Sequence, residues 1–263
     1  MNWDNKEEVL EIIKKDGWNL QFASDRLKND REVVIEAIKN DGWALNWASD
    51  ELKDDKKLVL EAVKNDGYAL KYASDKLKDD KEIVMEAVKQ SYESLYCASD
   101  RLKNDKEIVM IAVEKDGVAL NWASDRLKND KDVVMTAVKQ NGYNIVYSSD
   151  NMMNNKEIVM EEVKTNCKAL LFASIELTKD KDVIMEAVKN DSEALKYVFE
   201  KNQNKEIVLE AIKKNKEAFV FVGDKIKEQY PTVEKLLASE KETVKENPWE
   251  AKISNDKSSD LER

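Results

Sequence analysis

The apolar residues of this chain recur in one pattern that is repeated about nine times, in most cases 25 residues apart. The unit at residues 56–80 reads KKLVLEAVKNDGYALKYASDKLKDD. In the next copy the apolar positions of IVMEAV at 83–88 fall at i, i+1, i+4 and i+5, which is one face of a 3.6-residue helix. The pattern therefore predicts an amphipathic helix at the start of every repeat. Copies of this helix begin at Lys6, Arg31, Lys56, Lys81, Lys106, Lys131, Lys156, Lys181 and Lys205.

Signals at both ends of this helix predict its boundaries. Asn29 precedes Glu32 with the spacing of a capping box. The Asn29 side chain is therefore expected to accept a hydrogen bond from an unpaired backbone amide of the first turn. The helix is expected to end at the Asn-Asp-Gly signal of residues 65–67, where glycine can adopt the left-handed conformation without steric cost. A second, shorter helix is then expected from about Tyr68 to Ser74 or a little beyond.

Repeats of this kind predict an all-α fold. Two short antiparallel helices in 25 residues cannot bury their own apolar faces, so stacked neighbours must complete the core. We therefore expect an α-solenoid of about nine two-helix repeats over residues 1–223. Residues 224–246 are expected to form capping helices, with Pro231 in the first turn of the last one. Residues 247–263 have the composition of a disordered tail, in which Trp249 would be either docked on the last repeat or part of a short linear motif.

Three columns of the aligned repeats are predicted to form the core between neighbours. The always apolar or aromatic column is Phe22, Trp47, Tyr72, Cys97, Trp122, Tyr147, Phe172, Tyr197 and Phe221. A second column is Leu20, Leu45, Leu70, Leu95, Leu120, Ile145, Leu170, Leu195 and Phe219. The third, in the first helix, contains Met85, Met110, Met135, Met160 and Met185.

Another column, four residues before the aromatic one, is the leading candidate for a binding surface. It contains Trp18, Trp43, Tyr68, Glu93, Val118, Tyr143, Lys168, Glu193 and Glu217. A position that accepts Glu and Lys in some copies is not deeply buried there, so its aromatic members are expected to be half exposed. Exposed aromatics on a rigid scaffold are candidate anchors for a partner. The alternative is that each ring only covers the edge of the neighbouring repeat. The predicted partner-binding residues are Trp18, Trp43, Tyr68, Asp25, Asp50, Glu51 and Tyr143.

A second candidate surface lies in the middle of the chain. Tyr96, Val146 and Leu171 occupy a column that is mostly polar elsewhere, and Ile111 stands where most copies have Glu. They would form a modest apolar patch. Local repacking around residues 91–97, which lack the usual glycine, explains them equally well.

Composition narrows the classes of function. The chain has 54 acidic and 44 basic side chains, a net charge of −10, and the first 55 residues alone hold 14 acidic against 8 basic. This balance opposes binding to nucleic acid or to an anionic membrane. No window approaches the length of a transmembrane helix, and the charged N-terminus lacks an apolar signal core, so we expect a cytoplasmic protein.

Residues that carry chemistry are scarce. The chain has no His, which removes Ser-His and Cys-His nucleophiles and His metal sites, and no phosphate-binding glycine fingerprint is present. The recurrent Ser-Asp pairs such as Ser74-Asp75 are expected to form turns and caps rather than calcium sites. Cys97 and Cys167 are expected to be reduced thiols. We therefore expect no enzyme, cofactor, metal or small-molecule ligand.

The repeat text itself resembles a known family. DREVVIEAIKNDGWALNWASDELKDD at residues 30–55 and DKEIVMEAVK at 80–89 are similar to the repeats catalogued as domain-of-unknown-function family 4116, and the resemblance covers about residues 5 to 222. It implies an interaction scaffold and brings no assigned activity or catalytic residues. Repeats after Asn141 depart from the pattern through Cys167, Ile175 and Phe199, so altered repeat geometry is expected there.

Three functions follow from these observations. The first is a protein-binding α-solenoid whose partner is another protein of unknown identity. The second is an acidic inhibitor or effector that occupies the basic, nucleic-acid-binding groove of an enzyme, in a host-virus or anti-defence role. The third, RNA binding with one base per helical repeat, is disfavoured by the lack of a basic surface.

Overall fold

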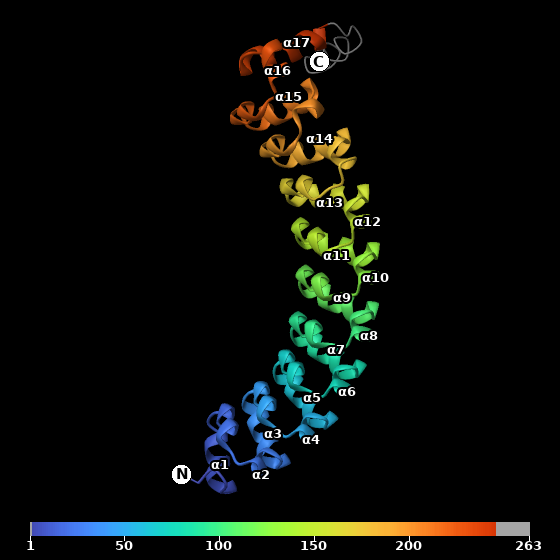
Figure 1. Ribbon diagram of the computed structural model, residues 1–263. Coiled ribbons are helices and arrows are strands. Elements are labelled where there is room, and N and C mark those ends of the chain that lie inside the picture. Colours follow the sequence, from blue (N-terminus) through green and yellow to red (C-terminus); the bar gives the residue numbers. More distant parts are fainter. Residues whose placement is uncertain (1, 246–263) are drawn as a thin grey trace, which may run out of the picture. The chain divides into compact units, whose positions relative to one another are not determined.

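A computed structural model describes residues 2–245, with side chains described to residue 240, and within this range the fold is all-α with no strand. Each regular repeat contains a ten-residue α-helix, a six-residue 3-10 helix and a four-residue α-helix (Figure 1). The predicted second helix from Tyr68 to Ser74 is therefore wrong in detail. It is a 3-10 helix, η3 (Gly67–Tyr72), followed by a separate short helix, α6 (Asp75–Lys78).

The long helices begin the repeats, as the apolar pattern predicts. They are α1 (Lys6–Ile13), α3 (Arg31–Asn40), α5 (Lys56–Asn65), α7 (Lys81–Gln90), α9 (Lys106–Lys115), α11 (Lys131–Gln140), α13 (Lys156–Thr165), α14 (Lys181–Asn190) and α15 (Lys205–Lys214). The 3-10 helices that follow them are η1 (Gly17–Phe22), η2 (Gly42–Trp47), η3, η4 (Tyr92–Cys97), η5 (Gly117–Trp122), η6 (Gly142–Tyr147), η7 (Cys167–Leu171), η9 (Ser192–Tyr197) and η11 (Lys216–Phe221). The short α-helices are α2 (Asp25–Lys28), α4 (Asp50–Lys53), α6, α8 (Asp100–Lys103), α10 (Asp125–Lys128) and α12 (Asp150–Met153).

Helix α7 shows why these residues form a helix. The carboxylate of Asp80 accepts hydrogen bonds from the backbone amides of Glu82 and Ile83 and so caps the first turn. The residues of its apolar face, Ile83, Val84, Ala87 and Val88, are completely buried. Burial of each Val or Ile side chain contributes about 1.5–3 kcal/mol. Helix α3 is capped in the same way by Asp30, one residue after the predicted Asn29.

The repeated glycine has a different role from the predicted one. No glycine in the described part of the chain has a positive φ, because the preceding Asp66 is itself extended and already ends α5. A Cβ on Gly67 would lie 2.3 Å from the backbone oxygen of Ala87 in the next repeat. Glycine is therefore needed for the close approach of η3 to α7, a contact between repeats that one repeat alone does not reveal.

The recurrent serine links neighbouring repeats. The backbone N–H of Ser124 donates to the carbonyl of Lys103 at 3.0 Å, and its hydroxyl donates to Asn104 Oδ1 at 2.7 Å. The same hydroxyl oxygen accepts the amide of Leu127 and caps α10. The predicted capping role is confirmed, and the link between repeats is an additional role. Equivalent hydroxyl links join Ser49 to Asn29, Ser74 to Asp54, Ser99 to Asp79 and Ser149 to Asn129.

Replacing Ser124 by alanine is expected to lower the free energy of unfolding by about 1–2 kcal/mol, because a helix cap and a hydrogen bond between repeats are lost together. Urea unfolding followed by circular dichroism measures the change. Asp125→Ala is the matched control, since this exposed neighbour should change stability by less than about 0.5 kcal/mol. Equal effects of the two variants would contradict the role given to the serine.

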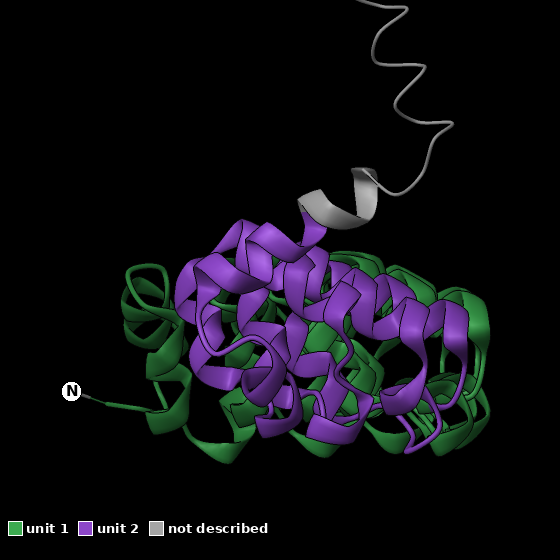
Figure 2. Cartoon of the chain, turned by 90° about the horizontal axis from the view of Figure 1, so that it is seen from above, with its two compact units in different colours: residues 1–153 green, residues 154–263 purple. Residues whose placement is uncertain are grey.

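The chain divides into two compact units, unit 1 at residues 1–153 and unit 2 at residues 154–263 (Figure 2). Within unit 1 each long helix packs on the next, α1 on α3, α3 on α5, α5 on α7, α7 on α9 and α9 on α11. Within unit 2, α13 packs on α14, α14 on α15 and α15 on α17 (Val233–Lys245). The boundary predicted after residue 223 stays a prediction.

The three predicted core columns differ in burial. The leucine column is buried from Leu20 to Leu195, and only Phe219 is partly exposed. The aromatic column, predicted to form core between neighbouring repeats, is only half buried, and Phe22 at its start is exposed, so the prediction holds only in part. The five methionines are also half buried. These side chains lie at the rim of the stack because the leucines and the small residues of the long helices already fill its centre.

Unit 2 departs from the regular repeat where its sequence does. Ile175 replaces the first Asp of the short helix and Phe199 replaces the capping Ser. The short α-helices are accordingly replaced by 3-10 turns, η8 (Leu177–Lys179) and η10 (Glu200–Asn202). The Ser174 hydroxyl still accepts the first amide of η8, whereas η10 has no side-chain cap within the described residues. The unit ends with α16 (Asp224–Gln229) and α17, which begins two residues after Pro231. The predicted tail and Trp249 lie outside the described residues. No helix between residues 2 and 245 is long and apolar enough to cross a membrane.

Candidate functional site

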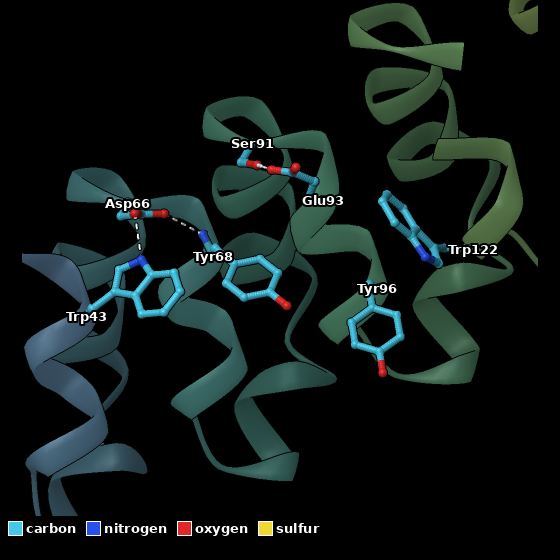
Figure 3. Close-up of a pocket in the computed structure, with 7 residues that line it drawn as sticks. All are labelled: Trp43, Asp66, Tyr68, Ser91, Glu93, Tyr96 and Trp122. Atoms are coloured by element: carbon cyan, nitrogen blue, oxygen red, sulfur yellow. Dashed lines mark hydrogen bonds between the residues drawn. The ribbon is translucent and has the colours of Figure 1, made fainter. Parts of the chain in front are cut away.

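An open cleft of about 560 Å³ lies along the 3-10 helices of unit 1. Its lining residues come from four consecutive repeats and are Trp43, Asp66, Tyr68, Ser91, Glu93, Tyr96 and Trp122. Figure 3 shows the four rings along the cleft, with Asp66 and Glu93 at its upper edge. The cleft is thus a product of stacking, since no single repeat contains it.

Trp43 and Tyr68 form one aromatic wall. Each is the second residue of its 3-10 helix, and their rings stack with centroids 5.5 Å apart and planes 28° apart. Asp66, the cap of η3, accepts the amide of Tyr68 at 2.8 Å and the indole Nε1–H of Trp43 at 2.7 Å. One carboxylate therefore positions both rings, and Tyr72 supports Trp43 edge-on at 5.7 Å.

Trp122 belongs to the opposite wall. Its ring stacks on Tyr92 with centroids 5.9 Å apart and meets the edge of Tyr96 at 6.2 Å. Trp122 ends η5, whereas both tyrosines belong to η4. Two aromatic groups, each held by contacts between repeats, thus border the same space.

Among the repeats that line the cleft, the sequence of η4 differs most from the regular repeat. It reads YESLYC where η3 reads GYALKY, so only Leu95 is kept. Tyr92 replaces glycine and stacks on Trp122, Glu93 replaces a ring of the ladder, and the small Cys97 replaces an aromatic residue. These changes remove two rings from the path of the ladder and open the cleft.

The cleft holds negative charge that no cation neutralises. Asp66 and Glu93 make no ion pair with any residue of the described chain, and Glu93 Oε2 accepts only the hydroxyl of Ser91, at 2.8 Å. Lys71 and Lys103 approach the rings instead, with Nζ 5.7 Å from the centroids of Tyr68 and Tyr96 respectively. These ring faces already attract cations.

The phenols of Tyr68 and Tyr92 stay neutral near pH 7, because their pKa values are raised. Burial raises the pKa of Tyr68, and the nearby Cys97, Tyr96 and Glu93 raise it further. Burial likewise raises the pKa of Tyr92, with Asp116 and Glu93 adding to the effect. The rings therefore act as apolar faces and hydroxyl donors, not as anions.

Of the seven residues predicted to bind a partner, the structure brings only Trp43 and Tyr68 into this cleft. Trp18 is 43% exposed and lies edge-on to Trp47 at 6.3 Å, in a separate pair. Tyr143 is 45% exposed in η6. The predicted half exposure of the aromatic ladder holds for all four rings.

The three predicted acidic residues lie elsewhere on unit 1. Asp25 and Asp50 begin α2 and α4 and are exposed. Glu51 follows Asp50 and lines a separate open pocket of about 610 Å³ together with Arg31 and Lys56. They do not contribute to the aromatic cleft.

Only one residue of the second predicted surface lies in the cleft. Tyr96, 56% exposed, belongs to the cleft, whereas Ile111 and Val146 are half buried and Leu171 is exposed in unit 2. Asp66, Ser91, Glu93 and Trp122 were not predicted as site residues. The concentration of changes in YESLYC was the signal that could have located them.

No group of three or more His, Cys, Asp or Glu in the described range is arranged to hold a metal ion. Both cysteines are free thiols. Burial raises the pKa of Cys97, and burial together with a hydrogen bond to Asp191 raises the pKa of Cys167 to about 11. Both are poor nucleophiles at neutral pH, because the thiolate is the reactive form.

A family model described as "Domain of unknown function (DUF4116)" matches residues 5–53, 55–103, 88–128, 105–153, 130–178, 155–203 and 180–227. Searches of curated proteins and of solved structures each gave no match.

Proposed function

Because the chain belongs to the DUF4116 family, whose description assigns no activity, we propose a function from the geometry alone: a non-catalytic scaffold whose aromatic cleft binds an extended segment of a partner protein. The observation that carries this proposal is the cleft itself, with four aromatic side chains and two carboxylates that make no ion pair within the described chain, all on one face of unit 1. Aromatic anchors in partly desolvated pockets dominate the energy of protein interfaces.

The dimensions of the cleft favour a segment over a small molecule. It is open along its length and spans four repeats, hence three steps of roughly 10 Å between packed helices. A stretch of about nine extended residues covers that length of about 30 Å. The rings are fixed by stacking and by Asp66, so little side-chain entropy is lost on binding.

Affinity purification of the full chain, followed by quantitative mass spectrometry, tests the proposal. The double variant Trp43→Ala/Trp122→Ala removes one anchor from each wall and is expected to lose a discrete partner that the unmodified chain recovers. Trp18→Ala is the matched control, because this exposed ring lies outside the cleft, and it should retain the partner. Retention by the double variant would exclude the cleft as the binding site.

A second proposal, an acidic inhibitor of a nucleic-acid enzyme, is favoured by charge. Unit 1 carries 31 acidic against 24 basic side chains, and the side chain of Asp50 is fully exposed. Such a complex would dissociate with rising salt, because the charges are solvent-exposed. Purification at 50 mM and 500 mM NaCl separates the two proposals, since a partner held by aromatic anchors should be retained at both.

A further inference from the structure

Glu93 is the carboxylate that borders the space between the two aromatic walls. Glu93 stands in the column where the three preceding repeats place Trp18, Trp43 and Tyr68. In Figure 3, Tyr68 and Trp122 lie on opposite sides of this space, Glu93 above it and Tyr96 below it. A ligand group that enters here meets ring faces and a carboxylate together.

The two carboxylates of the cleft are not equivalent. Both oxygens of Asp66 are already used, one by the amide of Tyr68 and the other by the indole of Trp43. Glu93 is exposed and accepts a single hydrogen bond, from Ser91. Glu93 is therefore the group available to accept hydrogen bonds from a ligand, whereas Asp66 contributes charge.

Ring faces beside an unpaired carboxylate select a cation. Guanidinium is planar, stacks on aromatic faces and pairs with a carboxylate through two parallel N–H groups, which a lysine ammonium does not reproduce. Lys71 and Lys103 already lie near Tyr68 and Tyr96 and would repel a dense basic run. One isolated cation at Glu93 fits this arrangement.

We propose that the cleft recognises a single arginine side chain of the partner segment, with its guanidinium between Tyr68 and Trp122 and hydrogen-bonded to Glu93. This inference rests on the proposed scaffold function and names the chemistry of its partner. The net charge of −7 on unit 1 adds a long-range attraction to such a segment.

The test is a titration of the full chain with acetyl-Gly-Arg-Gly-amide, followed by NMR of the indole N–H signals. The chain has six tryptophans, and Trp43→Phe and Trp122→Phe assign the two signals of the cleft. We expect both to shift with the arginine peptide. The neutral citrulline peptide, which keeps the shape, should bind at least tenfold more weakly, and the lysine peptide more weakly than arginine.

Two carboxylate variants distinguish binding at Glu93 from a general attraction of the peptide to negative charge. Glu93→Gln is expected to weaken arginine binding at least tenfold. Glu193→Gln, at the same repeat position in unit 2, should leave binding unchanged. Equal binding of citrulline and arginine, no effect of Glu93→Gln, or no shift of either indole at 50 mM peptide would each overturn the proposal.

Failure of this inference is distinguishable from failure of the scaffold function. A partner that is lost from the Trp43→Ala/Trp122→Ala variant while the arginine peptide does not bind leaves the scaffold standing and removes only the arginine. If the arginine peptide binds but no partner protein is recovered, the arginine site is supported and the scaffold function is contradicted.

Discussion

Replacing Glu162 by alanine is expected to stabilise the protein by about 3 kcal/mol at pH 7. Glu162 is completely buried in α13, and neither carboxylate oxygen has a hydrogen-bond partner within the described chain. It lies on a helix face with Ile158, Val159 and Val163, all fully buried. The other ten-residue helices have alanine at this position, so alanine fits the same packing without a polar group.

The same carboxyl predicts an unusual dependence of stability on pH. Burial raises the pKa of Glu162 from its ordinary value of 4.5 to about 9, because the low-dielectric interior disfavours the charged form. Between these values the folded state keeps a proton that the unfolded state releases. The part of the stability that depends on Glu162 is therefore greatest below pH 4.5, falls as pH rises, and is lowest above pH 9.

Urea unfolding at pH 5.5 and pH 8.0 measures this loss. The unfolding equilibrium constant of unit 2 should rise about tenfold per pH unit, which is roughly 3 kcal/mol over this range. The chain has no histidine, so few other groups titrate between these values. Glu162→Ala should abolish most of the slope. Because repeat proteins need not unfold in two states, hydrogen exchange of the α13 amides should show the same difference locally.

Glu161→Ala is the control for this prediction. Glu161 is the neighbouring carboxylate and pairs with Lys164 on the surface at 2.9 Å, an interaction of about 0.5 kcal/mol or less. It should change neither stability at pH 7 nor the slope by a measurable amount. A slope that persists in Glu162→Ala would mean that the buried carboxyl is not its source.

The periodicity of the sequence predicted the fold because the long helix is a local structure. The spacing in IVMEAV at 83–88 places its four apolar residues on one face, and all four are buried. The second helix could not be assigned in the same way. Leu70 and Leu77 have helical spacing, but the serine at 74 takes its partners from the preceding repeat and breaks the chain into a 3-10 helix and a separate turn of α-helix.

The candidate site was only half predictable, because part of it depends on contacts between repeats. Trp43 and Tyr68 stand out as aromatic residues in a column that accepts charge, which is visible in one alignment of repeats. Trp122 belongs to a column that reads as core, and Glu93 reads as an ordinary surface residue. Their shared role depends on how four repeats stack, and Tyr92 reaches Trp122 only through that stacking.

Giving η4 the sequence of η3 is expected to weaken binding strongly while keeping the fold. The five substitutions are Tyr92→Gly, Glu93→Tyr, Ser94→Ala, Tyr96→Lys and Cys97→Tyr, which give GYALKY. The variant returns two rings to the path of the ladder, at positions 93 and 97, removes the carboxylate of Glu93 and replaces the exposed Tyr96 by lysine. Loss of two anchor contacts costs about 3 kcal/mol, so affinity for the partner should fall roughly 100-fold.

The stability of this variant should stay near that of the unmodified chain. Ser94 is completely buried and its hydroxyl has no hydrogen-bond partner among the residues that the structure describes, so alanine there removes a cost of about 1–3 kcal/mol. Loss of the stacking between Tyr92 and Trp122 offsets about 0.5–1.5 kcal/mol of this gain. Thermal unfolding and isothermal titration calorimetry with the purified partner measure the two quantities separately.

The matched control makes the same kind of change outside the cleft. Asn46→Lys with Trp47→Tyr brings η2 closer to the text of η3, and neither residue lines the cleft, so the partner should bind as before. Binding by the restored η4 variant within threefold of the unmodified chain would show that recognition does not use the gap at Glu93. If the restored variant binds weakly and is also unfolded, the sequence YESLYC is needed for stability. The η3 sequence would then not pack between η3 and η5.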